Sequence, residues 1–219
     1  MTARTRIKVC GMTDLAEANG LVAAGVDALG FIFVEASPRN VVPEKAREIV
    51  ASLPPFVDAV GVFVDQELDV VNDIVSYCNL TMVQLHGSES PQYCEEVKAR
   101  VVKTFSIRPD SEVCETNPFY DPYLEMVSGI LLDTFHEKVA GGTGKTFDWE
   151  LIKKCRPAAP LILAGGLTPE NIADAVRQVR PFAVDVNSGV EIAPGVKDIE
   201  AVEALVESVR MTDKEIYDL

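Results

Sequence analysis

The feature that most constrains the fold is a regular alternation of short apolar runs with amphipathic stretches along the whole chain. The runs are four to seven residues long and rich in valine, isoleucine and leucine. Near-continuous apolar runs of this length are typical of parallel strands that are buried on both faces. The eight predicted strands are residues 7–10, 28–33, 59–64, 82–86, 101–107, 129–133, 161–164 and 183–186. Eight strands that alternate with helices predict a closed α/β barrel, a (β/α)8 or TIM barrel.

The stretches between the strands carry local signals for helix ends. Asp14 and Glu17 have the spacing of a capping box, and Gly25 predicts the end of the same helix. Pro43 predicts the first turn of the second helix, and residues 168–170, a Thr-Pro-Glu sequence, predict the start of a later one. These signals support helices between the predicted strands.

Residues 111–128 are the weakest part of this pattern, because Pro118 and Pro122 interrupt them. Proline inside a helix removes a hydrogen bond and clashes with the preceding turn, so we expect the fifth helix to be short or broken. An open doubly wound sheet is the competing architecture. Its usual Gly-x-Gly-x-x-Gly sequence after the first strand is missing here, which favours the closed barrel.

The chain has 219 residues, about the length of one such barrel. We therefore expect a single domain over residues 1–219, with a core at about 6–210 and a polar tail at 211–219. A net charge of −14 argues against nucleic-acid binding, which needs clustered lysine and arginine. The apolar runs are too short to cross a membrane, and no apolar signal region precedes the first strand, so we expect a cytoplasmic protein. The five cysteines are scattered and odd in number, which favours neither a metal site nor a disulfide framework.

Polar side chains stand at the carboxyl ends of the predicted strands, where the active sites of barrel enzymes lie. Cys10 ends the first strand, Arg39 follows the second, His86 the fourth and Asp133 the sixth. A cysteine there is usually a small buried residue, but a nearby helix N-terminus can lower the pKa of its thiol. An aspartate closing an apolar run is costly to desolvate unless it has a role, although it could also cap a helix. We expect His86 to support the reacting groups, since no second histidine lies near enough to suggest a metal pair.

Two glycine-containing loops follow the seventh and eighth strands, where barrels commonly bind phosphate through backbone N–H groups. The first contains Gly165 and Gly166, and the second contains Asn187, Ser188 and Gly189. Backbone amide donors would bind an anion even in an acidic protein, and the binding site would need no lysine or arginine side chain. The alternative is that these glycines only form tight turns.

A third glycine-rich segment, at residues 141–146, includes Gly142 and Gly144 and partly matches a P-loop. The P-loop pattern requires glycine where Val139 stands, so an ATPase is disfavoured. We interpret the segment as a mobile loop of the active site; a plain flexible turn is the alternative.

In the order and spacing of nine segments, the sequence resembles the phosphoribosylanthranilate isomerase family of tryptophan biosynthesis over about residues 6–210. The segments are KVCGMT (8–13), ALGFIF (28–33), SPR (37–39), VQLHG (83–87), LLDT (131–134), GGTGKTFDW (141–149), LAGGLTPEN (163–171), DVNSGVE (185–191) and PGVKD (194–198). Val9 stands where the family often has isoleucine, and Asn187 where many members have serine. Residues 108–128 depart most from the family.

The resemblance implies a ribulose-phosphate-binding barrel that performs an Amadori rearrangement without a metal or other cofactor. Asp133 would be the general acid that opens the furanose ring, and Cys10, as a thiolate, the general base that takes the proton from C2. Arg39 would bind the anthranilate carboxylate. The loops with Gly142, Gly144, Gly165, Gly166, Asn187, Ser188 and Gly189 would hold the phosphate, while His86 and Asp185 would support the reacting groups.

The expected partner is therefore a small phosphorylated substrate, and the expected assembly is a monomer or a homodimer. This chemistry requires Asp133 in a dry place and Cys10 near positive charge.

Three other functions fit a barrel of this kind. A sister isomerase of histidine biosynthesis runs the same chemistry, but that family has aspartate in the place of Cys10. A metal-dependent pentose-phosphate epimerase would need paired histidines and carboxylates at the strand ends. A non-catalytic barrel that binds a sugar phosphate would have no physical reason to keep Cys10, Arg39 and Asp133 together.

Overall fold

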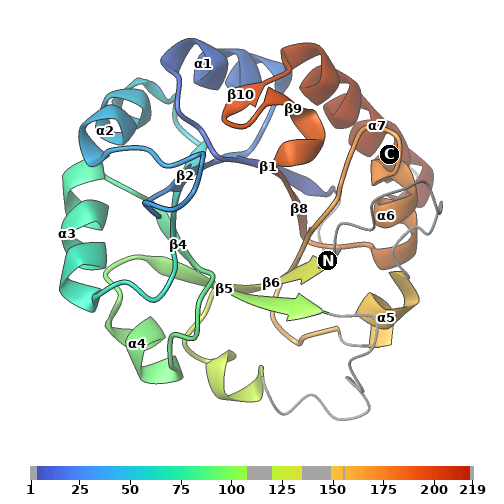
Figure 1. Cartoon of the computed structure of the whole chain (residues 1–219). Coiled ribbons are helices and arrows are strands. Elements are labelled where there is room, and N and C mark those ends of the chain that lie inside the picture. Colours follow the sequence, from blue (N-terminus) through green and yellow to red (C-terminus); the bar gives the residue numbers. More distant parts are fainter. Residues whose placement is uncertain (1–3, 108–119, 135–148, 155, 218–219) are drawn as a thin grey trace.

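Eight parallel strands close into a barrel in the computed structural model, which describes residues 4–107, 120–134, 149–154 and 156–217. Neighbouring strands pair in chain order, and β1 pairs with β8 to close the ring (Figure 1). The strands are β1 (Arg6–Cys10), β2 (Ala28–Ile32), β3 (Asp58–Phe63), β4 (Met82–Leu85), β5 (Arg100–Ile107), β6 (Gly129–Thr134), β7 (Leu161–Ala164) and β8 (Ala183–Val186). The predicted barrel is confirmed, and each predicted strand lies within one residue of its observed position.

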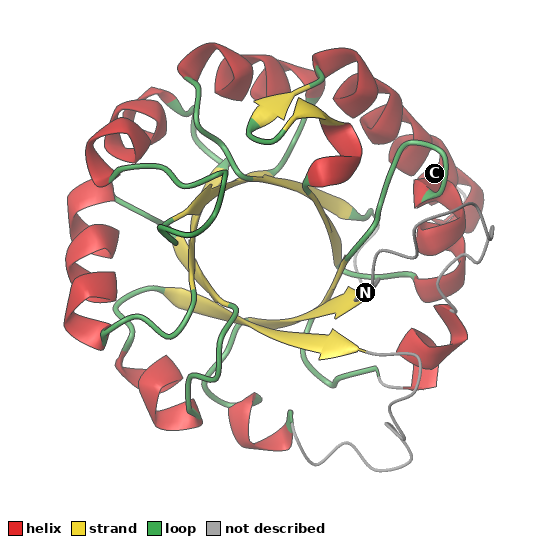
Figure 2. Cartoon of the chain, viewed as in Figure 1, coloured by secondary structure: helices red, strands yellow, loops and turns green. Residues whose placement is uncertain are grey.

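Helices surround the barrel and cover its outer face (Figure 2). They are α1 (Leu15–Ala24), α2 (Pro43–Ser52), α3 (Leu68–Cys78), α4 (Pro91–Glu96), α5 (Trp149–Lys154), α6 (Ile172–Val179) and α7 (Ile199–Tyr217). A small antiparallel pair, β9 (Glu191–Ala193) and β10 (Val196–Lys197), follows β8. The described part of residues 111–128 contains one short 3₁₀ turn, Asp121–Tyr123, in agreement with the predicted broken helix.

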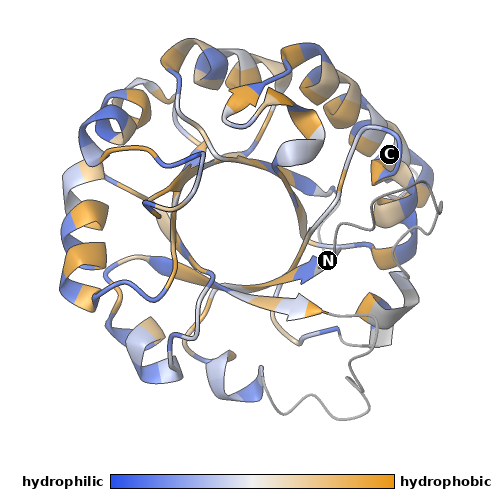
Figure 3. Cartoon of the chain, in the orientation of Figure 1, coloured by the Kyte–Doolittle hydropathy of each residue, from blue (hydrophilic) through white to orange (hydrophobic). Residues whose placement is uncertain are grey.

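Side chains alternate between two apolar layers because successive strand residues point to opposite faces. On β1, Ile7 and Val9 belong to the large core between strands and helices, whereas Lys8 and Cys10 face the interior of the barrel. Apolar residues colour most of the ring of strands, and the helices turn their polar side outward (Figure 3). A second, smaller cluster fills the barrel interior around Leu131 and Ile162. Side chains therefore fill the barrel interior around Leu131 and Ile162, and a ligand site can open only toward the ends of the barrel.

Two helix predictions need correction. The Asp14 carboxylate caps α1 by accepting from the N–H groups of Ala16 and Glu17, but the Glu17 carboxylate accepts from the N–H of Lys197 and so does not complete the capping box. Helix α6 begins at Ile172, later than the predicted start at 168–170. The preceding residues form a turn in which the Asn171 side chain accepts from the N–H of Thr168.

The polar tail expected from residue 211 onward is helical as far as Tyr217, where α7 ends. Asp213 is buried and accepts hydrogen bonds from the backbone N–H of Thr5 at 2.6 Å and from its hydroxyl at 2.8 Å. The last turns of α7 therefore hold the residue that precedes β1. No helix within the described ranges has the length and apolar character needed to span a membrane.

Candidate active site

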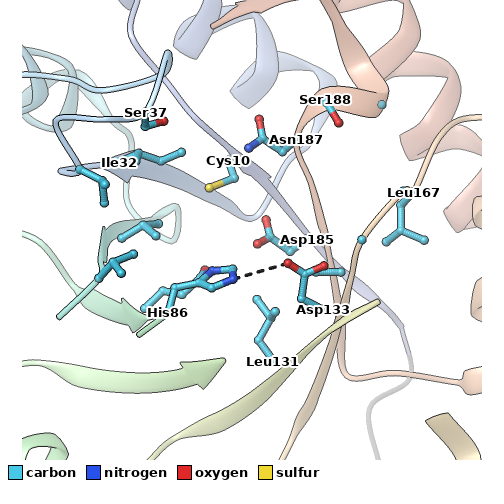
Figure 4. Close-up of a pocket in the computed structure, with 18 residues that line it drawn as sticks. Cys10, Ile32, Ser37, His86, Leu131, Asp133, Leu167, Asp185, Asn187 and Ser188 are labelled. Carbon is cyan, nitrogen blue, oxygen red and sulfur yellow. Dashed lines mark ion pairs between the residues drawn. The ribbon is translucent and has the colours of Figure 1, made fainter. Parts of the chain in front are cut away.

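A cavity of about 580 Å³ opens at the carboxyl end of the barrel. Cys10 from β1, Asp133 from β6 and Asp185 from β8 reach into it, together with His86, which follows β4 (Figure 4). The glycines and polar residues after β7 and β8, which are Gly165, Gly166, Asn187, Ser188 and Gly189, line the same cavity. The structure thus brings together residues that are far apart in the sequence, as the barrel topology predicts.

Cys10 is buried, with 5% of its surface exposed. Burial raises the pKa of its thiol and the charge of Asp185 raises it further, whereas the charge and hydrogen bond of Lys8 and the charge of Lys197 lower it. The net shift is upward, in contrast to the expected low pKa. The positive charges that favour the thiolate are those of these two lysines and of Arg39.

Lys8 and Asp185 form an ion pair at the inner end of the cavity. The Lys8 ammonium lies 2.8 Å from both carboxylate oxygens of Asp185, and both side chains are almost fully buried. The two residues are direct partners in the pairing of β1 with β8. Burial lowers the pKa of Lys8, but the charges of Asp185 and Cys10 outweigh burial, so the pKa is raised and the ammonium stays charged.

Asp133 pairs with His86 across the cavity. The Oδ2 of Asp133 lies 3.5 Å from the Nε2 of His86, and both side chains point into the same space (Figure 4). Their side chains are 30% and 34% exposed. The carboxyl group of Asp133 is therefore partly exposed to the cavity, whereas a dry position is expected from the sequence.

The loops after β7 and β8 approach each other closely. Gly165 and Gly166 both have positive φ angles, of 93° and 61°, which favour glycine. A Cβ atom on Gly189 would overlap the carbonyl oxygen of Leu167, so this approach also requires glycine. Among the described residues that line the cavity, none is a lysine or an arginine. Gly142 and Gly144, also predicted to bind phosphate, lie outside the described residues.

Arg39 lies beside the cavity and is held by a buried carboxylate. Its Nε lies 2.9 Å and its Nη2 2.6 Å from the two carboxylate oxygens of Glu191. Lys197, whose side chain is fully buried, lies 2.6 Å from Glu191 and 3.0 Å from the Oδ1 of Asn187. Burial alone would raise the pKa of Glu191, but the hydrogen bonds from Arg39 and Lys197 lower it to about 2. Glu191 is therefore a carboxylate that fixes two cations at the edge of the site.

Sequence reasoning did not find Lys8, Glu191 and Lys197. A signal for Lys8 was present, because a lysine inside an apolar strand must find a partner when it is buried. Lys8 also lies two residues before Cys10, which places both on the same face of β1. Glu191 and Lys197 gave no comparable signal, because they lie on the small β9–β10 pair.

Comparison with known proteins gives a consistent result. The family model for N-(5′-phosphoribosyl)anthranilate isomerase matches residues 7–208. The N-(5′-phosphoribosyl)anthranilate isomerase of Geotalea uraniireducens is 44% identical over 206 residues, which cover 94% of this chain and 98% of the relative.

Two solved structures are also similar over almost their whole length. One is a phosphoribosylanthranilate isomerase in complex with reduced 1-(o-carboxyphenylamino)-1-deoxyribulose 5-phosphate, with 39% identity, a TM-score of 0.80 and coverage of 94% and 99% of the two chains. The other is a monomeric form of the dimeric enzyme from Thermotoga maritima, with 38% identity, a TM-score of 0.79 and coverage of 94% and 98%. With its eight-stranded barrel and these matches over nearly its full length, the chain belongs to the N-(5′-phosphoribosyl)anthranilate isomerase family.

Proposed function

We propose that the protein converts N-(5-phosphoribosyl)anthranilate to 1-(2-carboxyphenylamino)-1-deoxyribulose 5-phosphate in tryptophan biosynthesis, with Asp133 as general acid and Cys10 as general base. The observation that carries the proposal is that Cys10 and Asp133 reach into one cavity, which is also lined by the glycine loops after β7 and β8. Membership of the family supports the same reaction.

The reaction begins with Asp133 in its protonated form. Asp133 gives its proton to the furanose ring oxygen, the bond from C1 to that oxygen breaks, and the nitrogen lone pair forms an iminium. The thiolate of Cys10 then takes the proton from C2. The electron pair of the C–H bond forms a double bond between C1 and C2, and the electrons of the iminium return to nitrogen. The resulting enolamine gains a proton at C1 and loses one from its hydroxyl to give the ketone.

The two ends of the substrate require different binding groups. We propose that the phosphate binds to backbone N–H groups of the loops that contain Gly165, Gly166 and residues 187–189, since no lysine or arginine of the described chain lines the cavity. Arg39 would bind the anthranilate carboxylate. Its hydrogen bonds to described residues use Nε and Nη2, which leaves the edge at Nη1 for a second carboxylate.

The direct test is turnover of freshly generated phosphoribosylanthranilate by the purified protein, followed as loss of the anthranilate fluorescence. The proposal predicts rapid loss of fluorescence with formation of the ketose product. If the protein binds sugar phosphates but leaves the fluorescence unchanged, it is a non-catalytic binding protein.

Arg39→Ala is expected to raise KM for the substrate about 10- to 100-fold, the range of a charge-assisted hydrogen bond of about 1.5–3 kcal/mol. The affinity for a simple sugar phosphate, measured as inhibition by ribulose 5-phosphate, is expected to stay unchanged. Arg39→Lys is the matched control, because it keeps the charge but loses the forked geometry, and it should restore only part of the affinity. An equal loss of affinity for both ligands would place Arg39 in the phosphate site instead.

Treatment with EDTA is expected to leave the activity unchanged, because the iminium accepts the electrons of the C–H bond and no metal is needed for this step. The measurement is the initial rate before and after chelation and dialysis. Activity that is lost and then restored by one divalent ion would contradict the mechanism and favour an epimerase.

We further propose that the protein is a monomer or a homodimer, since the related enzyme from Thermotoga maritima is described as dimeric. Light scattering coupled to size-exclusion chromatography measures this directly. A larger assembly would contradict the proposal.

A further inference from the structure

The thiol of Cys10 lies directly above a buried ion pair. Lys8 and Cys10 are two residues apart on β1, so their side chains share the inward face of the barrel. Asp185 holds the Lys8 ammonium with both carboxylate oxygens, at 2.8 Å each. Because both partners are less than a tenth exposed, water screens the charges of this pair only weakly.

Gly30 provides the space in which the ammonium and the sulfur meet. It is the direct partner of Cys10 in the pairing of β1 with β2. A Cβ atom on Gly30 would lie 2.7 Å from the Sγ of Cys10 and 3.0 Å from the Nζ of Lys8. Both atoms therefore lie around the volume that a side chain at this position would take, which brings the ammonium close to the sulfur.

The other charges near Cys10 come from the neighbouring elements. Arg39 follows β2, Lys197 lies on β10, and both are tied to Glu191 on β9. Asp133 and His86 line the cavity with Cys10. Of all these groups, Lys8 has the largest effect on the pKa of Cys10, which it lowers. Asp185 raises the same pKa by a smaller amount.

We propose that Lys8 is a positioning residue that favours the thiolate form of Cys10 and offsets part of the effect of burial, and that Asp185 fixes Lys8 in place while limiting this effect. The inference deepens the proposed function, because it explains how a buried thiol can act as the base. The ammonium stabilises the negative sulfur through its positive charge, which lies close to the sulfur in a buried space. The Asp185 carboxylate also keeps the Lys8 charge inside the barrel when the thiol is neutral.

The test is the pH dependence of alkylation of Cys10 by iodoacetamide, measured for this cysteine alone by mass spectrometry of the digested protein. The midpoint of the rate profile reports the thiolate and does not depend on turnover. Lys8→Met removes the cation with little change in volume. We expect its midpoint to rise by at least about one pH unit, which corresponds to about tenfold less thiolate at a given pH.

Asp185→Asn is expected to move the midpoint in the opposite direction, because it removes a negative charge near the sulfur. The double variant Lys8→Met/Asp185→Asn removes both charges of the pair, so neither is left buried without its partner. It therefore still provides a measurement if either single variant fails to fold. Its midpoint should lie above that of the unmodified protein and below that of Lys8→Met. The matched control is Lys103→Met, which removes a different buried lysine with its own carboxylate partner, Glu89. This control should leave the Cys10 midpoint unchanged.

The predicted order of the midpoints is Asp185→Asn, the unmodified protein, the double variant and then Lys8→Met. A purely structural role of the pair would move both single variants in one direction, or neither, and would overturn the inference. The limb of the pH profile of kcat/KM that reports the Cys10 thiol should move in the same order if Cys10 is the base. If the alkylation midpoints follow the order but this limb does not move, the inference about Lys8 stands and the proposed role of Cys10 fails.

Discussion

Replacing Asp133 with asparagine is expected to lower kcat by about 10²- to 10⁴-fold, the usual contribution of a well-placed general acid. Asparagine keeps the size and shape of the side chain and can still contact His86, which lies 3.5 Å from the carboxyl group. It has no acidic proton to give to the ring oxygen, so ring opening should fail. The measurement is kcat from the decrease of anthranilate fluorescence.

Binding provides the control for this variant. The affinity of Asp133→Asn for a stable analogue of the ketose product is expected to remain close to that of the unmodified protein. If His86→Gln lowers kcat by a similar factor, His86 takes part in the proton transfer itself and does more than contact Asp133. Near-normal turnover by Asp133→Asn would rule out Asp133 as the acid.

Replacing Cys10 with alanine is expected to lower kcat by a similar factor, about 10²- to 10⁴-fold, because the proton on C2 loses its acceptor. The thiol lines the cavity together with Asp133, so the variant should still bind the substrate and open the ring. The measurement is again kcat, with the affinity for the product analogue as the control for binding.

Alkylation checks the place of Cys10 independently of its variants. The product analogue should protect Cys10 more strongly than Cys78 and Cys94, which are buried elsewhere in the core. If Cys10→Ala retains near-full turnover, Cys10 is only a packed residue at the end of β1. The general base would then be sought first at Asp185 and His86, which line the same cavity.

Most of the fold could be predicted because its signals are local. The apolar runs that form β1 to β8 are continuous in the sequence, and α1 begins at its predicted cap, Asp14. The end of the chain could not be predicted in this way. Asp213 is buried and accepts hydrogen bonds from Thr5, 208 residues away, and no local pattern carries such a contact.

The site was predicted to a smaller extent. Cys10, Asp133 and the loops after β7 and β8 could be assigned to one end of the barrel, because all parallel strands end there. The charges that act on the thiol depend on strand register, as in the pairing of Lys8 with Asp185. They also depend on the fold of the β9–β10 pair, which brings Glu191 to Arg39. The upward net shift in the pKa of Cys10 follows from burial, which the sequence does not quantify.

The proposed division of labour between Asp133 and Cys10 is tested most directly by the isotope effect of a substrate that carries deuterium at C2. Cys10→Ser, a much weaker base, should make removal of the C2 proton rate-limiting and so show a primary isotope effect on kcat. Asp133→Asn should show little or none, because its slow step, ring opening, precedes cleavage of the C–H bond. A primary effect in Asp133→Asn together with none in Cys10→Ser would contradict the assignment of the two residues.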